Sequence, residues 1–245
     1  MATILHKRKA ADPSASDLTV GELAINTSDG GLFTKTSGGS VVEVGSGGGG
    51  GVTSDDEYNT VAGTNAGANF SGTSANHNTL FGYDAGNDIT TADYNVFIGK
   101  AGEKQTTGAS NVAIGYNAFK TSTTSHSNVM IGKAAAEANN GNKNVVIGFE
   151  ALEAATSAEE SVFIGSGAGK SITTGSYNVG VGQNAGTGEY NNATGSYNTS
   201  IGHEAGKRIS TGSNNSVLGV FSGDNITTGS DNVCIGANSG DTGTS

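Results

Sequence analysis

The stretch NVFIGKAG at residues 95–102 decides the fold, because close variants of it recur along most of the chain. They include NVAIGYNA at 111–118, NVVIGFEA at 144–151 and NTSIGHEAG at 198–206. The general form is N-[VT]-x-[IFLV]-G, and we call its last residue the anchor glycine. Anchor glycines stand at positions 63, 82, 99, 115, 132, 148, 165, 182, 202, 219 and 236. The chain therefore holds eleven copies of one unit, mostly 17 residues apart.

The length and composition of this unit predict a parallel β-solenoid, or β-roll. Seventeen residues are too few for the common helical-pair repeats, and Gly, Asn and β-branched residues are poor helix formers. An extended segment of this length suffices for one flattened coil, with neighbouring coils stacked about 4.8 Å apart. We therefore expect an all-β fold in which residues 58–245 form eleven coils.

The composition excludes several other classes of protein. The 245 residues include 41 glycines, one proline and no tryptophan, which is too few bulky residues for an ordinary globular core. The formal net charge of −10 disfavours nucleic acid and anionic membranes as partners. No apolar run is long enough to span a membrane, and residues 1–17 lack the apolar core of a signal peptide. We expect assembly in the cytoplasm, without membrane insertion.

The rest of the chain divides by composition into an N-terminal module and a linker. Residues 1–45 contain the short alternating segments ELAIN, LFTK and VVEV, which predict small antiparallel strands joined by glycine turns. The basic cluster HKRK at 6–9 is interpreted as a solvated arm. Residues 46–57, with five consecutive glycines, predict a flexible linker.

An asparagine stands four residues before the anchor glycine in ten of the eleven copies, and Ser161 replaces it in the other. Asparagine suits a corner of the coil because its side chain bonds nearby backbone. Stacked identical amides can also form a ladder along the solenoid. The predicted ladder comprises Asn59, Asn78, Asn95, Asn111, Asn128, Asn144, Asn178, Asn198, Asn215 and Asn232.

Side chains alternate between the two faces of each anchor strand. We expect the positions three and one before the glycine, such as Val96 and Ile98, to fill the coil interior. The middle position then points outward, yet it is apolar in nine of eleven copies. A partner copy must cover it, and a homotrimer is the favoured arrangement because oligomers close by symmetry. The predicted trimer-axis residues are Val61, Leu80, Phe97, Met130, Val146, Phe163, Val217 and Cys234.

The sequence predicts no catalytic, cofactor-binding or metal-binding residues. SVFIGSGAGKS at 161–171 resembles a phosphate-binding loop, but the residue five before Gly169 is Ile164 and not the glycine that the motif needs. The four histidines fall in different registers of the repeat, and the single cysteine, Cys234, is interpreted as an apolar filler. Asp84, Glu150 and Glu204 share the second position after the anchor glycine, and a solvated edge is favoured there over a calcium or glycosidase site.

Two resemblances follow from these motifs. The NVxIG coils resemble the heads of trimeric autotransporter adhesins, and the longer NVxIGxxAGxxITTGSxN pattern over residues 58–240 is similar to repeats in bacteriophage tail fibres. The N-terminal GELAINTSDGGLFTK is similar to a module that begins many phage fibre and receptor-binding proteins. The resemblance implies a virion fibre, on the tail or capsid surface, whose residues 1–45 bind another virion protein.

The resemblance also implies a role in host adsorption, through exposed loops such as 187–196 or the distal coils. The receptor would be a host cell-surface glycan or protein. One alternative is a purely structural component of the virion, such as a capsid-decorating fibre or baseplate spacer. Another is a polysaccharide-degrading tailspike, which would need acids and aromatic residues gathered in one groove. Aromatic residues make up only 6% of the chain and the acids are scattered, so we expect no enzymatic activity.

Overall fold

The chain folds into two compact units, residues 1–51 and residues 52–245. The computed structural model describes residues 6–9, 13–16, 18–26, 32–43, 53–54, 57–71, 74–188 and 192–240. These residues form strands and turns, so the predicted all-β class is confirmed. The described residues contain no helix that could cross a membrane. Part of the loop predicted at 187–196 lies outside them.

The N-terminal unit is a sheet with the order β1-β2-β3-β4. Its strands are β1 (His6–Lys9), β2 (Leu23–Asn26), β3 (Leu32–Lys35) and β4 (Val41–Glu43). The predicted antiparallel pairing holds for β2 with β3 and for β3 with β4. The basic segment His6–Lys9 is instead a strand that pairs in parallel with β2, so it is part of the sheet and not an arm. Leu18, Ala24 and Phe33 form a small core.

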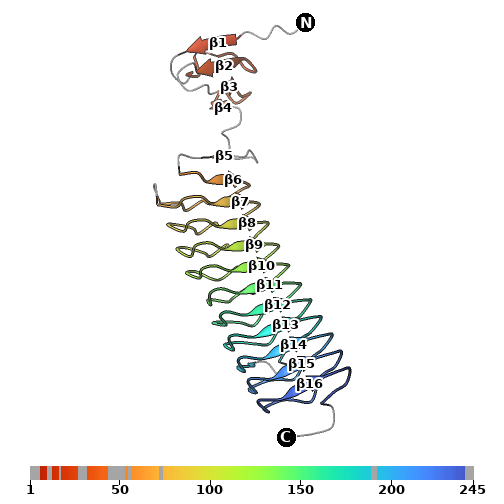
Figure 1. The fold of residues 1–245 in the computed structure, drawn as a ribbon. Coiled ribbons are helices and arrows are strands. Elements are labelled where there is room, and N and C mark those ends of the chain that lie inside the picture. The colour runs from red at the N-terminus through yellow and green to blue at the C-terminus, as the bar shows by residue number, and fades with distance from the viewer. Residues whose placement is uncertain are drawn as a thin grey trace. The chain divides into compact units, whose positions relative to one another are not determined.

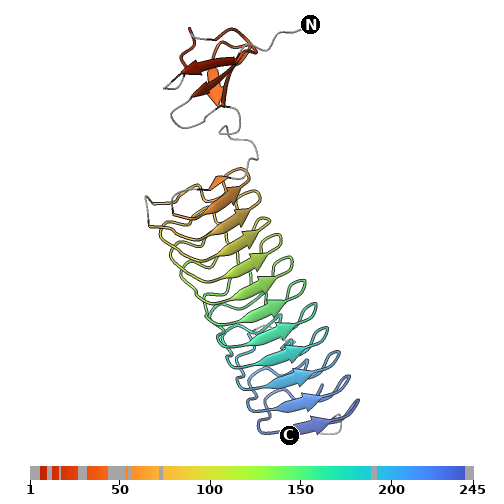
Figure 2. The same ribbon diagram turned by 45° about the horizontal axis from the view of Figure 1, so that its top comes forward.

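The second unit is a β-solenoid with one short strand in each coil (Figures 1 and 2). The strands are β6 (Thr60–Ala62), β7 (Thr79–Phe81), β8 (Val96–Ile98), β9 (Val112–Ile114), β10 (Val129–Ile131), β11 (Val145–Ile147), β12 (Val162–Ile164), β13 (Val179–Val181), β14 (Thr199–Ile201), β15 (Ser216–Leu218) and β16 (Val233–Ile235). They pair in parallel and in chain order, as predicted. A further short strand, β5 (Thr53–Ser54), pairs antiparallel with β6 at the end of the sheet.

Equivalent residues of neighbouring coils lie side by side. Val129 pairs with Val145 and Ile131 with Ile147, and the same register holds at the other parallel interfaces of this sheet. The hydrogen bonds run from coil to coil: Gly148 N donates to Ile131 O at 2.8 Å, and Val145 N donates to Ser161 O at 2.9 Å. Identical anchor sequences thus set the register of the sheet.

The anchor glycines are required by a close approach of backbones. Gly132 has a φ of 135°, and a Cβ added to it would lie 2.3 Å from the carbonyl oxygen of Gly148. A Cβ added to Gly148, whose φ is 149°, would likewise lie 2.2 Å from the carbonyl oxygen of Gly165. An L side chain strains at such φ values and also collides with the next coil. Glycine is therefore the residue that lets the chain leave the strand without separating the coils.

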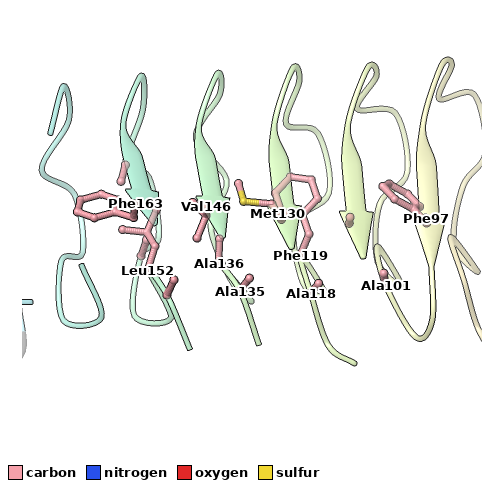
Figure 3. Close-up of a cluster of buried hydrophobic side chains, with 14 of the residues drawn as sticks. Phe97, Ala101, Ala118, Phe119, Met130, Ala135, Ala136, Val146, Leu152 and Phe163 are labelled. Atoms are coloured by element: carbon pink, nitrogen blue, oxygen red, sulfur yellow. The ribbon is translucent and has the colours of Figure 1, made fainter. Parts of the chain in front are cut away.

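The core lies inside the coils and is built from the middle residues of the strands, which corrects the sequence prediction (Figure 3). Six of the eight predicted trimer-axis residues are at most 1% exposed in a single chain: Leu80, Phe97, Met130, Val146, Phe163 and Val217. Val61 and Cys234, in the first and last coils, are partly buried. Strand alternation fixes which residues share a face, but the turn after the anchor glycine folds back over the middle residues, so these form the interior.

Large and small residues complement each other across this interior. Each coil has one residue in the left-handed conformation at the end of the turn that follows the anchor glycine. That residue is glycine where the middle residue is Phe97 or Phe163. It is Phe119, fully buried at a φ of 53°, where the middle residue is only Ala113. In these coils the exchange keeps the interior filled, as close packing requires.

Candidate interaction surface

The asparagine ladder predicted from the repeat is confirmed, and it lies at a buried corner of the coils. Asn128 donates from its backbone N and its Nδ2 to Asn111 Oδ1, at 3.0 and 3.1 Å. Its own Oδ1 accepts the same two bonds from Asn144, at 2.9 and 3.2 Å. Its Nδ2 also donates to Gly141 O at 3.1 Å. The left-handed residue at this corner is the one before the asparagine, such as Ser127.

Ser161 continues the ladder with a hydroxyl in place of an amide. Its backbone N donates to Asn144 Oδ1 at 3.0 Å, and its Oγ accepts from Asn178 N at 3.1 Å. A serine therefore keeps the acceptor on which the next coil depends. The ladder is structural, because its amides are buried and bonded to one another.

The outer side of the sheet is apolar, and we call it the strand face. It consists of the first and third residues of strands β7 to β16: Thr79, Phe81, Val96, Ile98, Val112, Ile114, Val129, Ile131, Val145, Ile147, Val162, Ile164, Val179, Val181, Thr199, Ile201, Ser216, Leu218, Val233 and Ile235. These side chains are half-buried to exposed; Ile98, Ile164 and Ile201 each show 38% of their surface. None of the twenty is charged. Both surfaces of most strands are thus apolar, as predicted, but the surface left open is the one that was expected inside.

The residue directly after each anchor glycine forms a second exposed column, the corner column. It comprises Thr64, Tyr83, Lys100, Tyr116, Lys133, Phe149, Ser166, Gln183, His203, Val220 and Ala237. From Tyr83 to Phe149, aromatic rings and lysines alternate coil by coil. Lys100 Nζ lies 5.6 Å from the ring centroid of Tyr83, and Lys133 Nζ lies 5.2 Å from that of Phe149. These are cation–π distances.

A third column bears stacked aromatic rings at the residue before the asparagine. His77 stacks on Tyr58 and Tyr94 with centroid distances of 5.1 and 4.9 Å, and Tyr177 stacks on Tyr197 at 4.8 Å. All five residues have φ values near 60° and are exposed. The left-handed conformation is unfavourable for bulky side chains. Stacking between coils offsets part of this cost.

Ion pairs form near the turns, most of them between neighbouring coils. The acids predicted to line a solvated edge are paired there: Asp84 with Lys100, Glu150 with Lys170 and Glu204 with Lys207. The hydrogen bond from Lys170 to Glu150 raises the pKa of that lysine. Burial pushes the pKa of Glu204 upward, but hydrogen bonds from Lys207 and Asn184 outweigh it, so its pKa lies below the ordinary value of 4.5.

A small cavity lies inside the coils around Ser200. The middle residues there are Gly180 and Ser200, and Phe163 of the preceding coil leans over Gly180. The cavity measures about 10 Å³, enough for one water molecule. The hydroxyl oxygen of Ser200, whose residue is 1% exposed, has no hydrogen-bond partner among the described residues.

The segment that resembles a phosphate-binding loop and the histidines lie apart. The loop at 161–171 is strand β12 followed by an ordinary turn, and its Lys170 is held by Glu150 at 2.6 Å. His126 Nδ1 accepts a hydrogen bond from Ala109 N, and His203 packs edge-on against Phe221. Among the described residues, no three potential metal ligands come together. Comparison of the chain with protein-family models, curated proteins and solved structures returns no match.

Proposed function

We propose that this protein is a homotrimeric fibre whose three solenoids pack through their strand faces. The observation that supports this most is the uncharged, apolar strand face, which runs over ten successive coils of a chain with net charge −10. Large exposed apolar patches usually mark interaction sites. The trimer axis is then lined by the first and third residues of each strand, and not by the middle residues as predicted from the sequence.

The regular register favours a parallel, symmetric assembly. Because equivalent residues form straight columns along the solenoid, identical chains can bring the same columns together at every coil. Closed rotational symmetry hides such a face without leaving an open surface for further growth. A face about 48 Å long and about 10 Å wide, from ten coils of three-residue strands, covers roughly 480 Å², which is less than the roughly 800 Å² that each partner of an ordinary interface buries, so residues that flank the strands must also take part.

We further propose that residues 1–45 attach the fibre to a virion and that the solenoid serves host adsorption. The support is the similarity of GELAINTSDGGLFTK and of the NVxIG repeats to phage fibres. Imaging of particles that carry a labelled copy of the chain tests this: label on the tail or capsid surface is expected. Particles without label, when the labelled chain is folded and abundant, would contradict it.

Sedimentation of the full chain tests the assembly. A species of three times 24.2 kDa is expected at micromolar concentration. The double variant Ile114→Asp and Ile147→Asp places charges on the strand face and should sediment as a folded monomer. The control variant Thr124→Asp and Ser157→Asp adds the same charges to exposed loop positions of the same two coils, and it should remain trimeric. A monomeric wild type, or a strand-face variant that stays trimeric, contradicts the proposal.

A further inference from the structure

We propose that Tyr116, Lys133 and Phe149 of the corner column bind a carboxylate-bearing polysaccharide. The inference rests on the proposed function for its choice of ligand, since a fibre that adsorbs to cells meets surface glycans first. The three residues belong to successive coils and follow their anchor glycines directly. We call them the corner triad.

The charge of Lys133 distinguishes the triad from the rest of the solenoid. Every other lysine of the described solenoid has a carboxylate within 4.0 Å, namely Lys100, Lys104, Lys120, Lys143, Lys170 and Lys207. Among the described residues, Lys133 has no such partner, and its ammonium lies beside the Phe149 ring. In a chain with almost twice as many acids as bases, this cation is left open to an anion from outside.

The two rings supply apolar contact on either side of that cation. Tyr116 is 58% exposed and Phe149 is 47% exposed, so both present their rings to solvent. The flat C–H face of a pyranose packs on aromatic rings, while a carboxylate forms a charge-assisted bond with an ammonium. One coil rises about 4.8 Å, close to the length of one sugar residue in an extended glycan. A chain of sugars along the column would thus place one carboxylate at Lys133 between two ring contacts.

Two other anionic ligands fit the triad less well. A nucleic acid needs several cations along its backbone, whereas Lys100, the next cation of this column, is already held by Asp84 at 3.5 Å and Glu103 at 3.3 Å. A flexible acidic peptide would use the lysine but gains less from the exposed rings. The combination of one open cation with two rings favours an acidic sugar.

Binding of defined polymers to the full-length protein tests the inference. The acidic probes are polygalacturonate and polysialic acid. Methyl-esterified polygalacturonate is the matched neutral probe, and polyglutamate is a polyanion without sugar rings. We expect at least one acidic glycan to bind, and to bind more tightly than either comparison polymer. Failure of both acidic glycans to bind, or equal binding of polyglutamate, would overturn the inference.

Two variants locate the site. Lys133→Met keeps the length of the side chain but removes its charge, and should weaken binding by about tenfold or more. Tyr116→Ala should weaken binding of the acidic and the esterified polymer alike. Lys143→Met, which removes an exposed lysine paired with Glu160, is the control and should bind as wild type. Undiminished binding by Lys133→Met would reject the site. Sedimentation of the same samples measures their oligomeric state, and so tests the proposed trimer independently of binding.

Discussion

Gly169 lies directly against the ring of Phe163, so that a Cβ added to this glycine would sit 2.6 Å from the Cδ1 and Cε1 atoms of the ring. In the coil that contains Ala113 the two roles are exchanged, and Phe119 occupies the position of the glycine. An aromatic ring thus fills the same interior space from either of two backbone positions in these coils.

This exchange predicts strong coupling between Ala113 and Phe119. Phe119→Gly should destabilise the protein by about 3–5 kcal/mol through the cavity it leaves, and Ala113→Phe should cost about 1–3 kcal/mol through overpacking. The double variant restores the arrangement of Phe163 and Gly169, and should lose much less stability than the two single costs combined. Urea unfolding of all four proteins measures the coupling energy. Additive losses would show that the two positions do not share one space.

The asparagine ladder should tolerate serine better than alanine. Asn128→Ala leaves Gly141 O and the backbone N of Asn144 without their bonds inside the protein, and should cost about 2–4 kcal/mol. Asn128→Ser can keep the acceptor, as Ser161 does naturally, and should cost roughly half as much. Thermal unfolding compares the two variants. Equal losses would mean that the acceptor oxygen contributes nothing.

Replacement of Ser200 should stabilise the solenoid. Ser200→Val removes a buried hydroxyl that lacks a partner and adds apolar volume beside the cavity, so we expect a gain of about 1–2 kcal/mol in unfolding free energy. Ser200→Thr is the matched control, because threonine has the shape of valine and keeps the hydroxyl. If threonine stabilises as much as valine, the gain comes from volume and the hydroxyl is already satisfied by water.

The ion pair of Glu204 and Lys207 predicts a modest pH dependence. The folded-state pKa of Glu204 is lowered, so its stabilising contribution is present above pH 4.5 and is lost as the pH falls through the lower folded value. Glu204→Gln removes this titration. At neutral pH the variant should be less stable than wild type by at most about 0.5 kcal/mol, because the pair is partly exposed. The difference should vanish well below pH 4.5, and a difference that grows in acid would contradict the assignment.

The repeat made most of the solenoid predictable from sequence. The anchor pattern placed a strand in every coil, and β8 at Val96–Ile98 falls inside NVFIG as expected. The recurrence of asparagine likewise predicted the ladder, because equivalent residues of neighbouring coils are stacked and their amides can bond to one another. The parallel strand at His6–Lys9 was missed, since a cluster of four basic residues carries no apolar alternation.

Which face of each strand lies inside could not be read from alternation alone, because both faces are apolar. The informative signal was instead the substitution of Phe119 and Leu152, both fully buried, for the glycine that most other coils place at the end of the turn. Their appearance beside Ala113 and Val146 marks the middle residues as interior. The corner triad could not be singled out from sequence, because the pairing of most other solenoid lysines depends on contacts between coils.

Most backbone hydrogen bonds of the solenoid run between coils, parallel to the direction in which the coils stack. Tension applied along that direction therefore loads all the bonds of an interface at once, including the amide ladder. A force that peels a single loop sideways breaks them one after another. The solenoid should consequently resist stretching far better than peeling, and pulling single molecules from the two kinds of attachment point would measure the ratio of the rupture forces.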